Sequence, residues 1–106
     1  MPMPKSRRAK ACDIPKKVKD AVWERDHHQC IRCGSPYAFP NAHYIRRSSG
    51  GLGIEENIVT LCMGCHNDFD NGWGDTPIII GAEIKRYLQD IYPSWDESNL
   101  YYQKWR

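Results

Sequence analysis

The stretch that decides the fold is LCMGCH at residues 61–66, which repeats the Cys-x-x-Cys pattern of CIRCG at residues 30–34. The two cysteine pairs are separated by 28 residues. Four thiolates supplied in this way form the tetrahedral sulfur set that Zn²⁺ prefers in closed structural sites. We therefore predict a structural zinc held by Cys30, Cys33, Cys62 and Cys65. With all four positions filled by protein, such a zinc stabilises the fold and performs no chemistry.

The rest of the chain also favours metal over disulfides. No apolar run approaches the ~18–20 residues of a membrane span, and residues 1–13, MPMPKSRRAKACD, lack the apolar block of a secretory signal. We expect a cytoplasmic protein that does not enter a membrane, in a compartment where cysteines stay reduced. The fifth cysteine, Cys12, is expected to be a free thiol. At 106 residues the chain should form one domain whose modest core needs the metal.

The net charge of +2 hides an asymmetry. Residues 1–19 contain seven Lys or Arg and one Asp, so the rest of the chain is net acidic. We predict a basic, flexible arm over residues 1–13. Such an arm can follow a phosphate backbone or can be a solubilising leader, and charge alone fits both interpretations. The side chains that would contact DNA phosphates are Lys5, Arg7, Arg8 and Lys10.

Hydrophobic spacing and turn residues predict a small α+β domain over residues 14–106. A helix is expected over about 15–26, with Asp13 as a cap and Val18, Val22 and Trp23 on one face. Between residues 30 and 57 the pattern favours a two-stranded ribbon around a loop. A short strand over residues 58–61 and a helix over about 64–71 follow, the helix ended by Gly72.

The C-terminal part, about 77–106, is predicted to be a helical extension. One apolar face at i, i+3, i+4 and i+7 runs through a helix that Pro93 ends; it consists of Ile84, Tyr87, Leu88 and Ile91. Ser94 and Glu97 are spaced as a capping box, which predicts a last short helix with Leu100, Tyr101 and Trp105 on one side. His27 and His28 are expected to be exposed to solvent.

An ordered series lies within and beside the cysteine pairs: His43, then Asn57 fourteen residues later, then His66 directly after the last cysteine. With VWERDHHQCIRCG, NAHYIRRSSGG and EENIVTLCMGCHNDF, the chain resembles the HNH endonuclease family over about residues 22–72. The resemblance is to the phage-type variety in which two Cys-x-x-Cys pairs bind a structural zinc. It implies a ββα-metal, treble-clef-like core and metal-dependent cleavage of DNA.

The resemblance also implies roles for individual residues. His43 matches the general base, for which an imidazole with a pKa near 6.5 is suited. Asn57 matches the asparagine that fixes the hairpin, and His66 a ligand of the catalytic ion. Asp70 is a second ligand at i, i+4. The ion would be Mg²⁺, Mn²⁺, Ni²⁺ or Zn²⁺, and the products would carry 5′-phosphate and 3′-hydroxyl ends. Arg46 and Arg47 would hold the phosphates.

Ala42 is a departure from the family, whose members often have a metal ligand directly before the base. Either His66, Asp70 and the DNA phosphate hold the ion with additional water, or Asn41 or Asn57 contributes, or activity is weak. In an alternative register His43 is the ligand and Tyr44 occupies the base position. Counting back from Gly50 and Gly51 favours His43 as the base.

Three functions remain open from the sequence. The first is an HNH DNA endonuclease or nickase, of phage or prophage origin, in the cytoplasm of a bacterial host. The second is a noncatalytic zinc module that binds nucleic acid. The third is a subunit that needs phage packaging or replication proteins as partners. The sequence does not indicate sequence specificity, oligomeric state or the choice between nicking and double-strand cleavage.

Overall fold

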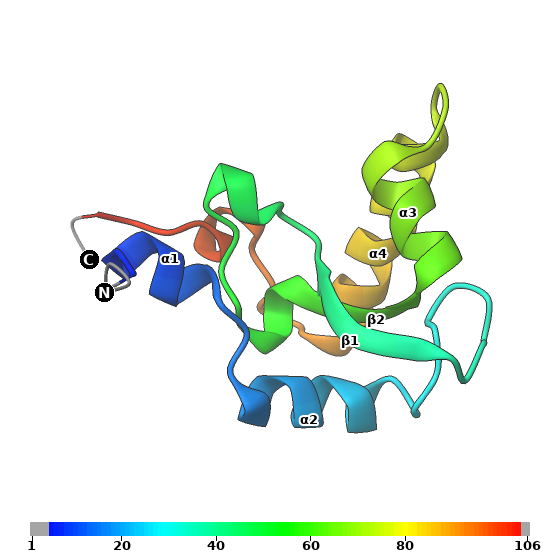
Figure 1. The fold of residues 1–106 in the computed structure, drawn as a ribbon, viewed down its shortest axis with the longest axis horizontal. Helices are drawn as coiled ribbons and strands as arrows, with labels where there is room; N and C mark the ends of the chain where they lie inside the picture. The colour runs from blue at the N-terminus through cyan, green and yellow to red at the C-terminus, as the bar shows by residue number, and fades with distance from the viewer. Residues whose placement is uncertain (1–4, 105–106) are drawn as a thin grey trace.

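An antiparallel pair of short strands, with helices on either side, forms the centre of the molecule (Figure 1). The computed structural model describes residues 5–104. The helices and strands, in chain order, are α1 (Arg7–Cys12), α2 (Lys16–Arg25), β1 (Ala38–His43), β2 (Ile58–Cys62), α3 (Met63–Asn71) and α4 (Thr76–Ile91). Short 3₁₀ turns occupy Arg47–Ser49, Glu55–Asn57 and Glu97–Leu100. The predicted fold class, a small α+β domain with a ββα core, is confirmed.

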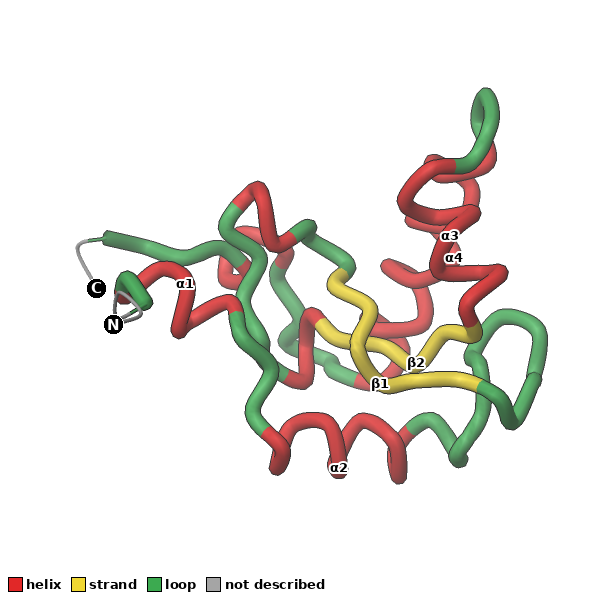
Figure 2. The backbone as a smooth tube through the Cα atoms, in the orientation of Figure 1, coloured by secondary structure: helices red, strands yellow, loops and turns green. Residues whose placement is uncertain are grey.

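The two strands pair across a long loop, which Figure 2 shows between their ends. Ala38 lies opposite Cys62 and His43 opposite Ile58, with one extra residue in β1 between Phe39 and Ala42. Pro40 lies in this bulge, where its missing N–H costs no ladder hydrogen bond. The prediction that both strands of the ribbon lie between residues 30 and 57 is wrong. The partner of β1 is the segment predicted as a separate strand.

Two clusters of apolar side chains cover the two sides of the strand pair. Val18 and Val22 of α2 pack against Ile58 on one side. The larger cluster joins β1 and β2 to α3 and α4 on the other side, and it includes Ala42, Val59, Leu61, Phe69, Ile80, Ile84 and Leu88. The strand pair therefore holds α2 and α3 apart, as Figure 1 shows.

A buried ion pair ties α2 to the rest of the fold. Asp26 is 2% exposed, and its carboxylate accepts hydrogen bonds from Tyr87 Oη at 2.6 Å and Thr60 N at 2.9 Å. The neighbouring Arg25 also donates to Asp26, and its other donors reach the main-chain oxygens of Glu55 and Ile58. A buried carboxylate is tolerated when it is paired and hydrogen-bonded in this way. The sequence analysis did not anticipate this network.

The N-terminal segment differs from the flexible arm that the sequence predicts. Residues 7–12 form α1, with the Ser6 hydroxyl accepting from Ala9 N at 3.0 Å at its start. Cys12 is a free thiol, as expected, but it is 1% exposed and belongs to the interior. Asp13 ends α1 and does not cap α2, which begins after Pro15. Residues 1–4 of the predicted arm lie outside the described part.

The C-terminal part follows the prediction as far as residue 92. α4 buries Ile80, Ile84 and Leu88 and ends at Ile91, with Tyr92 as its C-cap before Pro93. The capping box predicted at Ser94 and Glu97 is wrong, because Asp96 caps the following 3₁₀ turn by accepting from Ser98 N. Trp105 lies outside the described residues. Across residues 5–104, no helix combines the length and apolarity needed to cross a membrane.

Candidate functional site

The four predicted zinc ligands converge on one point. Cys30 and Cys33 come from the turn before β1, and Cys62 and Cys65 from the junction of β2 and α3. Their sulfur atoms all lie within 4.8 Å of one another, with Cys33 Sγ 3.6 Å from Cys62 Sγ. Zn–S bonds of 2.3 Å in a tetrahedron require sulfurs about 3.8 Å apart. The cluster therefore fits a structural zinc.

The electrostatics of the cluster also suit a cation. Burial raises the pKa of Cys30, but main-chain N–H groups of Cys33, Cys62 and Arg32 outweigh this and bring it down to about 7. Burial and the neighbouring Cys62 thiol raise the pKa of Cys65 to about 12. Four thiolates at this spacing repel one another, and a divalent cation offsets that repulsion.

A second group of predicted residues meets in a pocket of 330 Å³. His43 stands at the end of β1, while His66 and Asp70 lie one turn apart on α3. The pocket is lined by His43, Arg46, Arg47, Ser48, His66, Asp70 and Asn71. Ser48 and Asn71 were not anticipated, because an isolated serine or asparagine in a polar loop carries no signal of its own. The strand pair and α3 thus bring together residues 23 positions apart, His43 and His66.

His66 and Asp70 are two pocket side chains that could offer ligands to one ion. His66 Nε2 lies 3.2 Å from Asp70 Oδ2, and both side chains are partly exposed, at 31% and 42%. Two ligands at right angles around an ion, with bonds of about 2.1 Å, lie about 3.0 Å apart. This separation is that of a hydrogen bond or ion pair, and two ligands of a single ion could also lie this far apart. Within residues 5–104, the four cysteines are the only cluster of three or more His, Cys, Asp or Glu side chains able to share one ion.

His43 is held in one orientation by a main-chain oxygen. Its Nε2 lies 2.9 Å from the carbonyl oxygen of Cys12. Since a carbonyl oxygen only accepts, Nε2 carries the proton and Nδ1 holds the lone pair. Burial lowers the pKa of His43, and the charges of Arg47 and His66 act in the same direction. The ring is therefore neutral near pH 7 and has one nitrogen able to accept a proton.

Asn57 bridges the loop between the strands. The residue is 0% exposed, and its Oδ1 accepts from Ile45 N at 2.7 Å. Its Nδ2 donates to the carbonyl oxygens of Ile45 and Leu52, at 3.2 and 2.8 Å. All the polar atoms of the amide are thus used within the loop. Asn57 is fully buried, and neither Asn57 nor Asn41 lines the pocket.

Comparison with known proteins agrees with this geometry. The family model described as HNH endonuclease matches residues 30–71, the segment that holds both cysteine pairs and the pocket residues of β1 and α3. This chain belongs to the HNH endonuclease family. The HNH segment thus extends from Cys30, the first cysteine of the zinc cluster, to Asn71, the last residue of α3.

Two curated proteins share sequence with this HNH chain. The CRISPR-associated endonuclease Cas9 of Corynebacterium diphtheriae is 30% identical over 74 residues, which are 62% of this chain and 7% of that protein. Anaredoxin of a Nostoc species is 31% identical over 58 residues, 54% of this chain and 76% of that protein. This chain therefore corresponds to a small part of the Cas9 protein. No solved structure matches it significantly.

Tyr44 faces away from the pocket of the HNH segment. Its hydroxyl donates to Glu97 Oε1 at 2.6 Å, and its ring packs edge-on against Trp95. Burial, followed by the bond to Glu97, raises the pKa of Tyr44 well above its ordinary value. Tyr44 therefore anchors the C-terminal part of the chain, and His43 is the residue of this pair that lines the pocket.

Ala42, at the position where many HNH chains have a ligand, is fully buried in the larger core cluster. The same cluster contains side chains of β2 and α3, among them Val59 and Cys65. A small apolar side chain is what this packed position requires. Residue 42 is thus part of the core and offers no metal ligand to the pocket.

The basic residues near the pocket make contacts within the chain. Arg46 Nη2 donates to the Asp70 carbonyl oxygen at 3.1 Å, and Arg47 Nη2 to that of Ala9 at the same distance. Arg8 Nη2 donates to the Ser48 carbonyl oxygen at 3.0 Å. Three further basic side chains lie in the same N-terminal segment: Lys5, paired with Asp13, and the exposed Arg7 and Lys10 of α1.

The Gly-Gly turn is fixed by close packing. A Cβ at Gly51 would lie 1.7 Å from the carbonyl oxygen of Ile45, so no larger residue fits there. Gly50 has a φ of 86°, a left-handed conformation that favours glycine. Gly50 O also accepts from Tyr102 N at 2.7 Å. Local backbone geometry thus accounts for this part of the SSGG motif.

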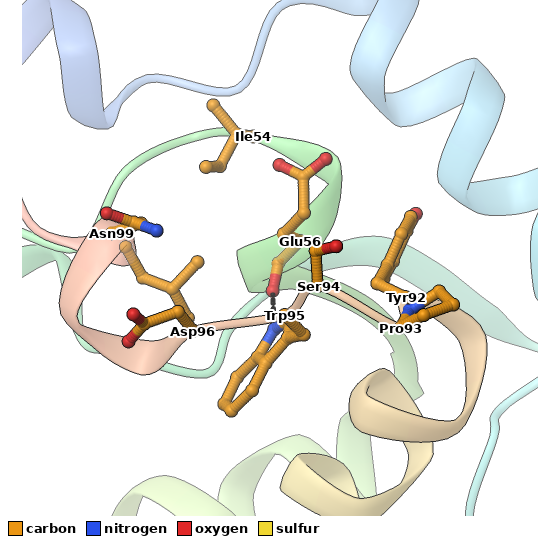
Figure 3. Close-up of a pocket in the computed structure, with 9 residues that line it drawn as sticks. Ile54, Glu56, Tyr92, Pro93, Ser94, Trp95, Asp96 and Asn99 are labelled. Atoms are coloured by element: carbon orange, nitrogen blue, oxygen red, sulfur yellow. Dashed lines mark hydrogen bonds between the residues drawn. The ribbon is translucent and has the colours of Figure 1, made fainter.

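A separate pocket of 360 Å³ lies beside the C-terminal segment (Figure 3). Trp95 from this segment donates its indole N–H to the Glu56 carbonyl oxygen at 2.8 Å, as the dashed line in Figure 3 shows. None of the residues of the His43 pocket lines it. The Trp95 contact joins the C-terminal segment to the 3₁₀ turn that leads into β2.

Proposed function

We propose that this chain is a metal-dependent DNA endonuclease or nickase that hydrolyses phosphodiester bonds. The observation that carries the proposal is the pocket shared by His43, His66, Asp70 and two arginines. A neutral imidazole with a free nitrogen, a two-donor metal site and guanidinium groups are the three parts that phosphodiester hydrolysis needs. Membership of the HNH family supports the same reaction.

In this proposal His43 is the general base. With Nε2 bound to the Cys12 carbonyl, Nδ1 accepts a proton from the water that attacks phosphorus. Asn57 contributes by holding the loop at Ile45 and Leu52, which keeps His43 at a constant position. Orientation of this kind lowers the barrier because the reacting groups are already placed.

His66 and Asp70 would hold the catalytic divalent cation, which would be Mg²⁺, Mn²⁺, Ni²⁺ or Zn²⁺. When bound, such an ion neutralises charge on the phosphate and stabilises the leaving 3′ oxygen. Asp70 and His66 would bind the ion as a pair, and because both side chains are partly exposed, water and phosphate oxygens could complete its coordination. The products are a 5′-phosphate and a 3′-hydroxyl.

The basic residues would hold the DNA backbone. Arg46 and Arg47 line the pocket and are the residues proposed to contact the phosphate being cleaved. Lys5, Arg7, Arg8 and Lys10 lie on the N-terminal segment and are proposed to contact phosphates farther along the strand. Arg7 and Lys10 are exposed side chains of α1, so they need no rearrangement to do so.

A plasmid nicking assay tests the proposal. The wild type, loaded with zinc, should convert supercoiled plasmid to open-circular or linear DNA with Mg²⁺ or Mn²⁺. His43→Ala should lose this activity and Tyr44→Phe should keep it, because Tyr44 faces away from the pocket. Loss in Tyr44→Phe together with full activity in His43→Ala would show that the alternative register is correct.

A second candidate, a noncatalytic zinc module that binds nucleic acid, is favoured by one observation. The His66 and Asp70 site has two protein donors, and Ala42 cannot add a third. This candidate predicts DNA binding that weakens with salt and no nicking with any divalent ion. The same plasmid assay therefore separates the two functions.

For the biological setting we propose DNA as the substrate and phage packaging or replication proteins as partners, in the cytoplasm of a bacterial host. The resemblance to phage-type HNH chains is the feature that supports this setting. Copurification with packaging proteins from infected cells, compared with a His43→Ala chain that keeps its surface, tests this setting.

A further inference from the structure

The N-terminal segment, residues 6–13, is docked on the loop that carries the pocket arginines. It lies outside the HNH segment of residues 30–71. Four contacts join it to the rest of the site: Gly53 N to Ala11 O at 3.0 Å, Arg8 Nη2 to Ser48 O at 3.0 Å, Arg47 Nη2 to Ala9 O at 3.1 Å, and His43 Nε2 to Cys12 O at 2.9 Å. Three of these contacts use main-chain oxygens of the segment and the fourth uses the Arg8 side chain, so together they depend on the position of the whole segment.

Gly53 shows how close the docking is. A Cβ at this position would lie 1.9 Å from the carbonyl oxygen of Asp13 and 3.0 Å from the Cα of Ile14. All of the nearest atoms belong to the N-terminal segment and its continuation. Glycine at position 53 is therefore required by the close approach of the docked segment.

Charge pairs add to the docking. Asp13 pairs with Arg47 of the loop and with Lys5, which directly precedes the segment. The bond from Lys5, and then that from Arg47, holds the pKa of Asp13 below its usual range. Cys12, between these contacts, is 1% exposed. The side chains and the main chain of the segment thus both face the loop.

We propose that residues 6–13 are a positioning element of the catalytic loop, in which the Cys12 carbonyl holds His43 in the Nε2–H form. The proposal rests on the proposed function of His43 as the base. If the segment leaves the loop, Nε2 loses its acceptor and the neutral ring can exchange between its two tautomers. Only one of these tautomers presents Nδ1 as the base.

Gly53→Ala is the variant that tests the proposal, because it forces the segment away without removing a charged or catalytic side chain. Gly81→Ala is its matched control: the same change in α4, where the new Cβ meets only a ring atom of Phe69 at 3.4 Å. We expect Gly53→Ala to nick plasmid about 100-fold more slowly at saturating DNA, since a misplacement of about 1 Å can cost that much. Gly81→Ala should nick at the wild-type rate.

A spectroscopic measurement makes the test independent of activity. Long-range ¹H–¹⁵N spectra of the imidazole rings, assigned with His43→Gln, should show His43 as the Nε2–H tautomer in the wild type and as a mixture in Gly53→Ala. Asp13→Asn, which weakens the docking without adding a Cβ, should give a smaller change in the same direction. This second variant serves if Gly53→Ala does not fold.

The outcomes separate the positioning role from the proposed function. A wild type that does not nick DNA, but shows the tautomer change in Gly53→Ala, would refute the nuclease and leave the docking correct. Unchanged His43 spectra in both folded variants would overturn the positioning role, whatever the activity. A fall in DNA affinity that matches the fall in rate, with an unchanged tautomer, would assign the segment to DNA binding and also overturn it.

Discussion

Replacing Asn57 with alanine should destabilise the domain strongly, because its buried amide makes three hydrogen bonds to the loop. The bonds join Oδ1 to Ile45 N at 2.7 Å and Nδ2 to the carbonyl oxygens of Ile45 and Leu52. At about 1 kcal/mol for each lost bond, with more for the buried N–H left without a partner, we expect a loss of about 3–4 kcal/mol. For a domain of this size that corresponds to a fall in Tm of more than about 10 °C.

The assay is urea or thermal unfolding of the zinc-loaded protein, followed by circular dichroism. Asn67→Ala is the matched control, because Asn67 is an exposed residue of α3 whose amide oxygen accepts only from Asn71. It should change the free energy of unfolding by less than about 0.5 kcal/mol. A loss of under 1 kcal/mol in Asn57→Ala would refute the assignment of the loop's stability to this amide.

Three further predictions concern the metal, the pH dependence and the arginines. Metal analysis of the purified chain should find one zinc, and Cys62→Ser should lose it and unfold at a lower temperature; a wild type with no zinc would contradict the four-cysteine site. Because burial lowers the pKa of His43, the unfolded chain takes up that proton first, so stability should fall as the pH drops from about 6.5 toward the folded pKa. His43→Gln should lose less stability over this pH range. Identical curves of stability against pH for the variant and the wild type would refute the lowered pKa of His43. Arg46→Ala and Arg47→Ala should weaken DNA binding and reduce its salt dependence, and an unchanged salt slope would exclude phosphate contacts.

The zinc site and helix α4 could be predicted because their signals in the sequence are local. Two cysteines with two residues between them place both sulfurs on one turn. The apolar residues of α4 repeat at helical spacing. His27 and His28, which flank the end of α2, are exposed, as the sequence suggested. In these stretches each residue's position follows from its near neighbours in the sequence.

The strand pairing and the N-terminal segment could not be predicted, because they depend on contacts between distant residues. Pro40 and the bulge beside it hide the strand pattern of β1, whose partner lies beyond the loop. Nothing in SRRAKACD indicates that Ala11 and Cys12 offer their carbonyl oxygens to Gly53 and His43. A main-chain acceptor leaves no mark in the sequence, since every residue has one.

The capping residues show the same limit on a smaller scale. Three residues are good caps by residue type: Asp13, Ser94 and Asp96. From the sequence we predict caps at Asp13 and Ser94. In the structure Asp96 caps a 3₁₀ turn, while Asp13 pairs with Lys5 and Arg47. The choice among equivalent polar residues is made by the packing around them.

The central claim is that His43 is the base of a metal-dependent DNA nuclease, and single-turnover nicking of plasmid with Mg²⁺ or Mn²⁺ tests it most directly. Zinc-loaded wild type should nick, and folded His43→Ala with wild-type DNA affinity should be slower by at least about 100-fold. Activity in the wild type that persists undiminished in His43→Ala, or no activity in the wild type with either ion, would contradict the account.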